Sequence, residues 1–253
     1  MTVDLQVVDG VAVLTLNRPQ RRNAIDLATA QRLECIVDEI DAREDVVVSV
    51  LAGQGEVFCA GADLKAFRDT GALAVTARRG GFGMLDCPSG KPMIAAVQGA
   101  ALGGGFELAL ACDLIVAAED AVFGLPEVTY GLVPSGGGML RLPQRIPQAL
   151  AYRMILTGEP IDVDQAHSAG LVSSVVPADR VVSEALALAR VIAHNAPLSV
   201  AAAKRVLDRA RDWSIEERFA RQAAITDPVL ASADAAEGAR AFAERRPPVW
   251  TGT

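Results

Sequence analysis

Two glutamates, Glu107 and Glu127, are the side chains of this sequence that are best placed to do chemistry. Each lies among apolar residues, and a buried acid is costly unless it has a use. Glu107 follows the glycine cluster Gly103–Gly105 and lies within an apolar run that predicts a buried helix over residues 106–112. Glycines before a helix let backbone N–H groups approach a ligand, with the positive end of the helix dipole behind them. Two acids beside such donors could provide a general acid, a general base and an oxyanion hole.

Each glutamate also has a plainer explanation. Glu107 alone could be a carboxylate that the dipole of its own helix favours near the N-terminus. Glu127 follows Pro126, and an acid in the first turn after a proline is common in helices without any catalytic role. The catalytic interpretation therefore depends on whether other segments of the chain supply the oxyanion hole.

Length and composition limit the classes of protein that the chain can represent. Its 253 residues can bury a sizeable core, as one large domain or as a domain with an appendage. Half of the residues are hydrophobic and 4% are aromatic, so we expect a core of Ala, Val, Leu and Ile. The net charge of −7 argues against binding to nucleic acid or to an anionic membrane surface. We find neither a secretory signal pattern nor an apolar run that could span a bilayer, and expect a cytoplasmic protein.

Other familiar sites are not supported. The four cysteines have neither disulfide nor metal-ligand spacing, which favours a reduced protein without a metal. The glycine cluster does not begin a G-x-G-x-x-G pattern, and no phosphate-binding loop motif is present. Of the two histidines, His167 and His194 are expected to be surface or capping residues. Asp162 and Asp164 are expected to cap a helix.

The pattern of apolar runs predicts an α/β fold. Asp9-Gly10 between two apolar runs predicts a hairpin, and Asp26 is expected to cap a helix over Leu27–Ala42. Strands that repeatedly lead into glycine turns and helices place the chemistry at the turns, and a helix joining strands implies right-handed ββα units. The predicted strands are Leu5–Val8, Val11–Leu16, Val46–Leu51, Met93–Val97, Leu114–Ala118 and Leu171–Val176.

The last quarter of the chain has a different pattern, with no strand after Arg180. We therefore divide the chain into a core over residues 1–195, with the active site, and a helical region over residues 196–253. The segment from Ala66 to Cys87 is rich in glycine and has weak periodicity, which is typical of a lid near the substrate or of a poorly packed surface segment. The predicted late helices cover residues 181–194, 198–211, 215–225 and 233–245.

Five short motifs, in order along the chain, resemble those of one known family, the enoyl-CoA hydratase/isomerase (crotonase) superfamily. As a set they span nearly the whole sequence, and together they are far more specific than any one of them. The resemblance implies an α/β, crotonase-like spiral of ββα units with a C-terminal helical trimerisation region. The motifs are Asn17-Arg18-Pro19 with Asn23-Ala24, the segment Phe58–Leu64, the segment Ala101–Glu107, the segment Phe123–Glu127 and the tail Pro248–Gly252.

The resemblance assigns a role to each candidate residue. The backbone N–H groups of Ala62 and Gly104 match the oxyanion hole of the family, Glu107 the base that activates water, and Glu127 the acid that protonates the α-carbon. Since isomerases of the family can work with one acid at the position of Glu127, the pair favours an enoyl-CoA hydratase that adds water syn to a 2-enoyl-CoA thioester. The chain departs from the PGAGG pattern of typical hydratases at Ser135, where those enzymes have a glycine whose N–H helps to hold the catalytic water.

The resemblance also implies an acyl-CoA thioester as the partner, no cofactor beyond the CoA of the substrate, no metal, and a homotrimer or a dimer of trimers. Phe242 and Arg246 match the region that reaches a neighbouring active site, although Phe242 could equally be a core residue. For Arg21, Arg22 and Lys65, solvated surface charge is an equally good explanation. The residues that would bind substrate or CoA are Arg21, Arg22, Ala24, Ala60, Asp63, Leu64, Lys65 and Ser135.

Two other functions stay open at this stage. The first is a double-bond isomerase or another acyl-CoA enzyme that uses the same oxyanion hole. The second, from a different class, is a non-catalytic acyl-CoA-binding or scaffold subunit that assembles through its helical tail.

Overall fold

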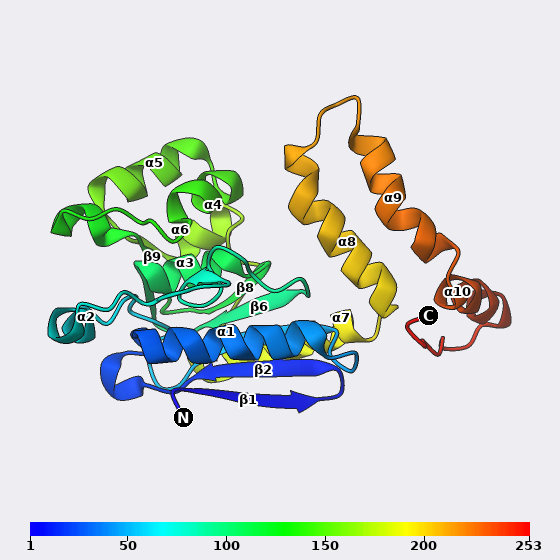
Figure 1. Ribbon diagram of the computed structural model, residues 1–253, viewed down its shortest axis with the longest axis horizontal. Coiled ribbons are helices and arrows are strands. Elements are labelled where there is room, and N and C mark those ends of the chain that lie inside the picture. Colours follow the sequence, from blue (N-terminus) through cyan, green and yellow to red (C-terminus); the bar gives the residue numbers. More distant parts are fainter.

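The computed structural model describes all residues from 1 to 253 and has a six-stranded sheet at its centre (Figure 1). Strands β1 and β2 form the predicted hairpin, in which Asp9 and Gly10 both have positive φ, as a two-residue turn of this kind requires. The other neighbours pair in parallel, so helices must connect them. In sheet order, the strands are β1 (Val3–Val8), β2 (Val11–Leu16), β3 (Val48–Gly53), β6 (Met93–Val97), β8 (Leu114–Ala118) and β11 (Ser174–Val176).

The strand predictions are confirmed, with differences at their ends. Strands β6 and β8 have the predicted bounds, and every residue of β3 is buried, as expected of a central parallel strand. Strand β11 is shorter than predicted because the N–H of Leu171 donates to the carbonyl oxygen of Ala166 and closes the preceding helix. Two small sheets complete the β structure, with β7 (Ala100–Leu102), β9 (Val122–Gly124) and β10 (Ile161–Asp162) in one, and β4 (Val75–Thr76) and β5 (Gly80–Gly81) in the other.

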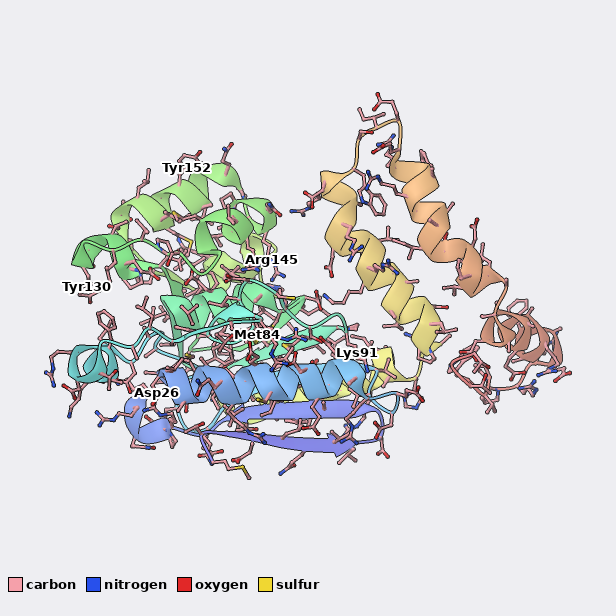
Figure 2. The ribbon with its side chains drawn as sticks, in the orientation of Figure 1. Asp26, Met84, Lys91, Tyr130, Arg145 and Tyr152 are labelled. Atoms are coloured by element: carbon pink, nitrogen blue, oxygen red, sulfur yellow. The ribbon has the colours of Figure 1, made fainter.

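The helices of the core pack on the sheet and above its strand ends. Asp26 caps α1 as predicted, since its carboxylate accepts a hydrogen bond of 2.8 Å from the N–H of Thr29. Met84 is fully buried in the interior beside α1 (Figure 2). Four short 3-10 helices connect the elements, at Pro19–Arg21, Pro126–Tyr130, Ala178–Arg180 and Ala210–Asp212. The core helices are α1 (Leu27–Ala42), α2 (Leu64–Thr70), α3 (Gly104–Ala111), α4 (Gly138–Arg145), α5 (Gln148–Thr157), α6 (Val163–Ser168) and α7 (Val181–Ala193).

The last three helices project from this core (Figure 1). Helices α8 (Pro197–Arg209) and α9 (Arg218–Leu230) run side by side as an arm, and α10 (Ala233–Glu244) lies with the C-terminus near the end of the arm at which α8 begins. All four predicted late helices are present, and the proposed boundary at residues 195 and 196 falls between α7 and α8. No single helix is long and apolar enough to cross a membrane; by length and composition alone, one bent pair could, Ala178–Ala193 with Pro197–Asp212, which is broken by 108°.

Candidate active site

Glu107 lies in the first turn of α3, a helix whose apolar residues are all buried. Its side chain is 5% exposed, and its Oε1 accepts a hydrogen bond of 2.9 Å from the backbone N–H of Gly138. Burial raises the pKa of Glu107, while the N–H groups of Gly138 and Gly136 lower it. Because Gly138 is the first residue of α4, the positive end of that helix dipole also faces the carboxylate. Glu107 is thus a desolvated acid with donors that favour its ionised form.

Glu127 occupies a different environment in the 3-10 helix Pro126–Tyr130. Its Oε2 is buried and has no hydrogen-bond partner. The pKa of Glu127 is raised to about 7, mainly by burial and further by the negative charge of Glu107, against the lowering effect of its own backbone N–H. A methyl group added to Gly103 would lie 3.2 Å from Oε1 of Glu127, so this carboxyl group packs directly against the glycine cluster. Near neutral pH, Glu127 therefore carries a proton for much of the time.

The two glycine-containing loops that carry Ala62 and Gly104 are in direct contact. A methyl group on Gly61, which has a φ of +92°, would lie 3.2 Å from the backbone nitrogen of Gly104, and one on Gly105 would lie 2.1 Å from the carbonyl oxygen of Cys59. Only hydrogen fits at such backbone-to-backbone contacts. The two loops therefore approach as closely as glycine allows.

The amides of these loops are free to bind an oxygen atom. Ile25 donates to the carbonyl oxygen of Gly61 and accepts from the N–H of Asp63, which leaves the N–H of Ala62 between them without a protein acceptor. Gly104 is the first residue of α3, so its N–H has no acceptor within the helix. Two unpaired N–H groups on adjoining loops are the donors that an oxyanion hole needs.

Both glutamates and both loops line one cavity of about 420 Å³. Its wall is mostly apolar, which strengthens electrostatic interactions inside it. Five acidic side chains line the cavity, and no lysine, arginine or histidine does. The lining apolar side chains include Phe67, Leu73, Phe82, Leu85, Leu132 and Val133, and the acidic ones are Asp26, Asp63, Asp86, Glu107 and Glu127.

The structure brings together seven of the twelve predicted site residues. Five others lie outside the lining of the cavity, and Arg21, Arg22 and Lys65 among these are exposed. Ala24 and Ala60 lie beside them, since Ala24 donates to the carbonyl oxygen of Arg21 and Ala60 to that of Arg22. Their role in binding CoA stays a prediction. The seven lining residues are Ala62, Asp63, Leu64, Gly104, Glu107, Glu127 and Ser135.

The carboxylate of Asp63 already has partners within the protein. It caps α2 by accepting a hydrogen bond of 3.0 Å from the N–H of Ala66, and it pairs with Arg18 at 3.0 Å. Arg18 also pairs at 2.9 Å with Asp26, which stands at the beginning of α1 (Figure 2). This network joins the motif around Asn17-Arg18-Pro19 to the oxyanion loop and fixes the backbone of Ala62 next to Asp63.

Outside the cavity, the structure tests the expectations for Asp162, Asp164 and Phe242. Asp162 caps α6, as predicted, by accepting from the N–H of Gln165, whereas Asp164 lies in the first turn and makes no cap. The explanation of Phe242 as a core residue is wrong for this chain, because its side chain is 87% exposed. Arg246 pairs with Glu237 and Glu244, each at 2.6 Å.

Sequence reasoning missed the apolar walls of the cavity. Phe67, Leu73, Phe82 and Leu85 come from the glycine-rich segment between Ala66 and Cys87, in which weak periodicity hid their common orientation. The positive φ of Gly71 and Gly80 turns the backbone at irregular intervals, so that no helical or strand period relates these side chains. The only sequence signal was the presence of large apolar residues among glycines.

A sheet with parallel strands thus carries two adjoining glycine loops with free amides and two desolvated glutamates, groups that together can bind an oxyanion and transfer protons. A comparison with family models matches residues 6–253 to the enoyl-CoA hydratase/isomerase family. The chain belongs to this family, and the predicted fold is confirmed.

Individual relatives agree with this assignment. The chain is 40% identical to 2,3-dehydroadipyl-CoA hydratase of Escherichia coli K12, over 96% of this chain and 95% of that protein. It is 41% identical to carnitinyl-CoA dehydratase of Citrobacter koseri, over 94% of each protein. The crystal structure of enoyl-CoA hydratase EchA1 from Mycobacterium marinum has a TM-score of 0.97 and 48% identity, with 100% of this chain and 99% of that chain covered. The protein is accordingly an enzyme of the hydro-lyase type.

Proposed function

We propose that the chain is an enoyl-CoA hydratase that adds water syn to the double bond of a 2-enoyl-CoA thioester, and removes it in the reverse direction. The single observation that best supports this reaction is the contrast between the two glutamates of one cavity. Backbone donors surround Glu107, whereas Glu127 has a pKa of about 7 and a buried oxygen without a partner. Environments that separate two acids in this way define a base and an acid.

In the proposed step, the thioester oxygen accepts hydrogen bonds from the N–H groups of Ala62 and Gly104. Glu107 takes a proton from water as the water oxygen bonds to the β-carbon, and the electrons of the double bond move toward the thioester oxygen. Glu127 then gives its proton to the α-carbon. At the end Glu107 is protonated and Glu127 ionised, and exchange with solvent restores both. Since only water and protons move, the proposal calls for no cofactor other than the CoA of the substrate, and for no metal.

We further propose that the acyl group is uncharged at its far end. The cavity offers that end apolar side chains and the carboxylate of Asp86, and no cation. Leu85 lies between Asp86 and the proposed base Glu107, next to Gly136 on one side and Gly81 on the other. A methyl group on Gly136 would lie 2.6 Å from Oε2 of Glu107 and 2.5 Å from Cδ1 of Leu85, and one on Gly81 would lie 3.2 Å from the same Cδ1 and 3.8 Å from Oδ1 of Asp86.

The experiment for the main proposal compares Glu107→Gln, Glu127→Gln and the control Glu119→Gln in the hydration of crotonyl-CoA. Glu119 is an exposed glutamate between the two acids in the sequence. We expect each catalytic variant to lose about 10²–10⁴-fold in kcat with little change in acyl-CoA affinity, and the control to keep its activity. Full turnover by either catalytic variant contradicts the assignment of roles.

The alternatives give different products in the same assay. An isomerase would convert 3-enoyl-CoA to 2-enoyl-CoA without forming a hydroxyacyl product, and a scaffold subunit would bind acyl-CoA in calorimetry without turnover. The carboxylate of Glu107 beside its two amides favours hydration, because water must be activated on that side.

We propose a homotrimer or a dimer of trimers as the assembly and the cytoplasm as the location. Large apolar side chains on the helical arm support assembly, because they are exposed in the single chain and an exposed apolar patch of this kind marks a contact surface. Light scattering coupled to size exclusion should give three or six times the chain mass of 26.4 kDa, and a monomeric mass would contradict the proposal. The exposed apolar side chains that support this assembly are Leu207, Ile215, Phe219, Leu230 and Phe242.

A further inference from the structure

Arg141 lies one turn into α4 and connects two backbone segments of the cavity wall. Its Nη1 donates a hydrogen bond of 3.1 Å to the carbonyl oxygen of Gly136, and its Nη2 donates one of 2.5 Å to the carbonyl oxygen of Leu85. Leu85 and Gly136 both line the cavity, and their segments are 51 residues apart in the sequence. A planar guanidinium that bonds two carbonyl groups fixes both their distance and their orientation.

The backbone at Gly137 is shaped for this guanidinium. A methyl group on Gly137 would lie 2.0 Å from Nη1 of Arg141, and the φ of Gly137 is +105°, which a residue with a side chain rarely adopts. The arginine therefore folds back over the glycine turn at the start of its own helix. Its position and the conformation of the turn depend on each other.

The segment that Arg141 holds is the one that binds the proposed base. The N–H of Gly138 donates to Oε1 of Glu107, and a methyl group on Gly136 would lie 2.6 Å from Oε2. A shift of this turn would move the donors of both carboxylate oxygens at once. Cδ1 of Leu85 also contacts Gly136, so the arginine controls the spacing between the base and the apolar wall.

Charge adds a second effect to this geometry. The positive charge of Arg141 lowers the pKa of Glu107, which burial raises. Burial lowers the pKa of Arg141 itself, and Glu107 and Asp86 raise it. The arginine thus favours the ionised carboxylate that a base requires.

We propose that Arg141 is a positioning residue of the hydration reaction, which acts by fixing the turn Gly136–Gly138 against Leu85 so that its N–H groups orient the carboxylate of Glu107. This inference rests on the proposed function, since it assigns Arg141 a part in making Glu107 an effective base. No contact between Arg141 and substrate is needed.

Arg145 is a matched control on the same helix. It is also a partly buried arginine that donates through Nη2 to a backbone carbonyl, that of Cys112, and burial lowers its pKa as well. It lies on the side of α4 that faces the helical arm, and Glu107 is not among the charges that act on it (Figure 2). A purely structural role predicts similar effects for the two arginines.

The experiment measures kcat, KM and pH profiles of crotonyl-CoA hydration for Arg141→Met, Arg141→Lys and Arg145→Met, with the melting temperature of each. For Arg141→Met we expect kcat to fall about 10²-fold with KM nearly constant, because a misplaced catalytic group costs about this much. We also expect the acidic limb of kcat/KM to shift to higher pH. Arg141→Lys keeps the charge but cannot bond two carbonyl groups in the same way, so it should restore the acidic limb and leave kcat low.

Equal kinetics and equal pH profiles of Arg141→Met and Arg145→Met overturn the inference. If Arg141→Met does not fold, Arg141→Lys carries the test, and wild-type kcat in that variant overturns it. A carboxyl NMR titration with ¹³C-labelled glutamate, assigned with Glu107→Gln, separates this inference from the proposed function. Absence of hydration by the wild-type protein would overturn the proposed function. Independently of activity, a pKa of Glu107 that does not rise in Arg141→Met, or that rises equally in Arg145→Met, would overturn the effect of Arg141 on Glu107.

Discussion

Replacing Gly105 by alanine would test whether the two amides of the oxyanion hole act together. Gly105 carries no chemical group of its own, and it lies in the first turn of α3, next to Gly104. A methyl group there would come within 2.1 Å of the carbonyl oxygen and 2.6 Å of the carbonyl carbon of Cys59. Both are backbone atoms of the segment that leads to Ala62, so the clash cannot be relieved by rotating a side chain.

The size of the effect follows from this contact. An ordinary van der Waals contact begins at 3.4 Å, so α3 and the Cys59 segment must separate by about 1.3 Å. The N–H groups of Gly104 and Ala62 would separate with them, and one of the two could no longer reach the thioester oxygen. Loss of one oxyanion donor costs about 10²–10³-fold in kcat, or about 2.7–4 kcal/mol of transition-state stabilisation.

The assay is the loss of the enoyl thioester absorbance of crotonyl-CoA in Gly105→Ala and in the control Gly90→Ala. A methyl group on Gly90 meets no atom within 4 Å, so the control should keep wild-type activity. We expect Gly105→Ala to lose about 10²–10³-fold in kcat/KM while circular dichroism shows the wild-type helix content. A folded Gly105→Ala enzyme with more than half of the wild-type activity would refute the assignment of Ala62 and Gly104 as joint donors.

Three further predictions concern the carboxyl groups of the cavity. Burial raises the pKa of Glu127 to about 7, and its proton is needed, so kcat/KM should fall as pH rises through 7, and a Glu127→Gln enzyme should lack this limb. The same shift means that the folded state binds this proton more tightly than the unfolded chain does, so the free energy of unfolding should fall as pH rises from about 4.5 to 7. In denaturant unfolding, the free energy of the wild type minus that of Glu127→Gln should therefore fall over this range. A constant difference would contradict the shift. Because Asp86 lines the cavity and no cation does, a six-carbon enoyl-CoA with a terminal carboxylate should be hydrated about fivefold less efficiently than its uncharged analogue, a cost of about 1 kcal/mol at close range in water. In Asp86→Asn, the difference in kcat/KM between the two substrates should become smaller. A wild-type enzyme that prefers the carboxylate substrate would contradict the role of Asp86.

The order of the elements was largely predictable from the sequence. The hairpin at Asp9-Gly10, the cap at Asp26 and the strands Met93–Val97 and Leu114–Ala118 all depend on interactions within a few residues, and the local pattern contains them. The ends of other elements depend on distant partners. β11 begins only at Ser174, and the N–H of Leu171, within the predicted strand, instead closes α6 by bonding to Ala166.

The sequence by itself determined the chemical groups: two glutamates in apolar surroundings and two glycine-containing loops whose type and order match one family. Only the tertiary structure decided their environments. Glu107 and Glu127, 20 positions apart, are both desolvated but differ in surroundings, because Glu107 meets the N–H groups of Gly136 and Gly138 whereas Glu127 meets only its own backbone N–H and keeps a buried oxygen without a partner. The apolar walls and the contact of Arg141 with Leu85 were also invisible in the sequence, because they join segments that no local period relates. Proton affinity and shape depend on what surrounds a group in space, and packing between distant segments sets both.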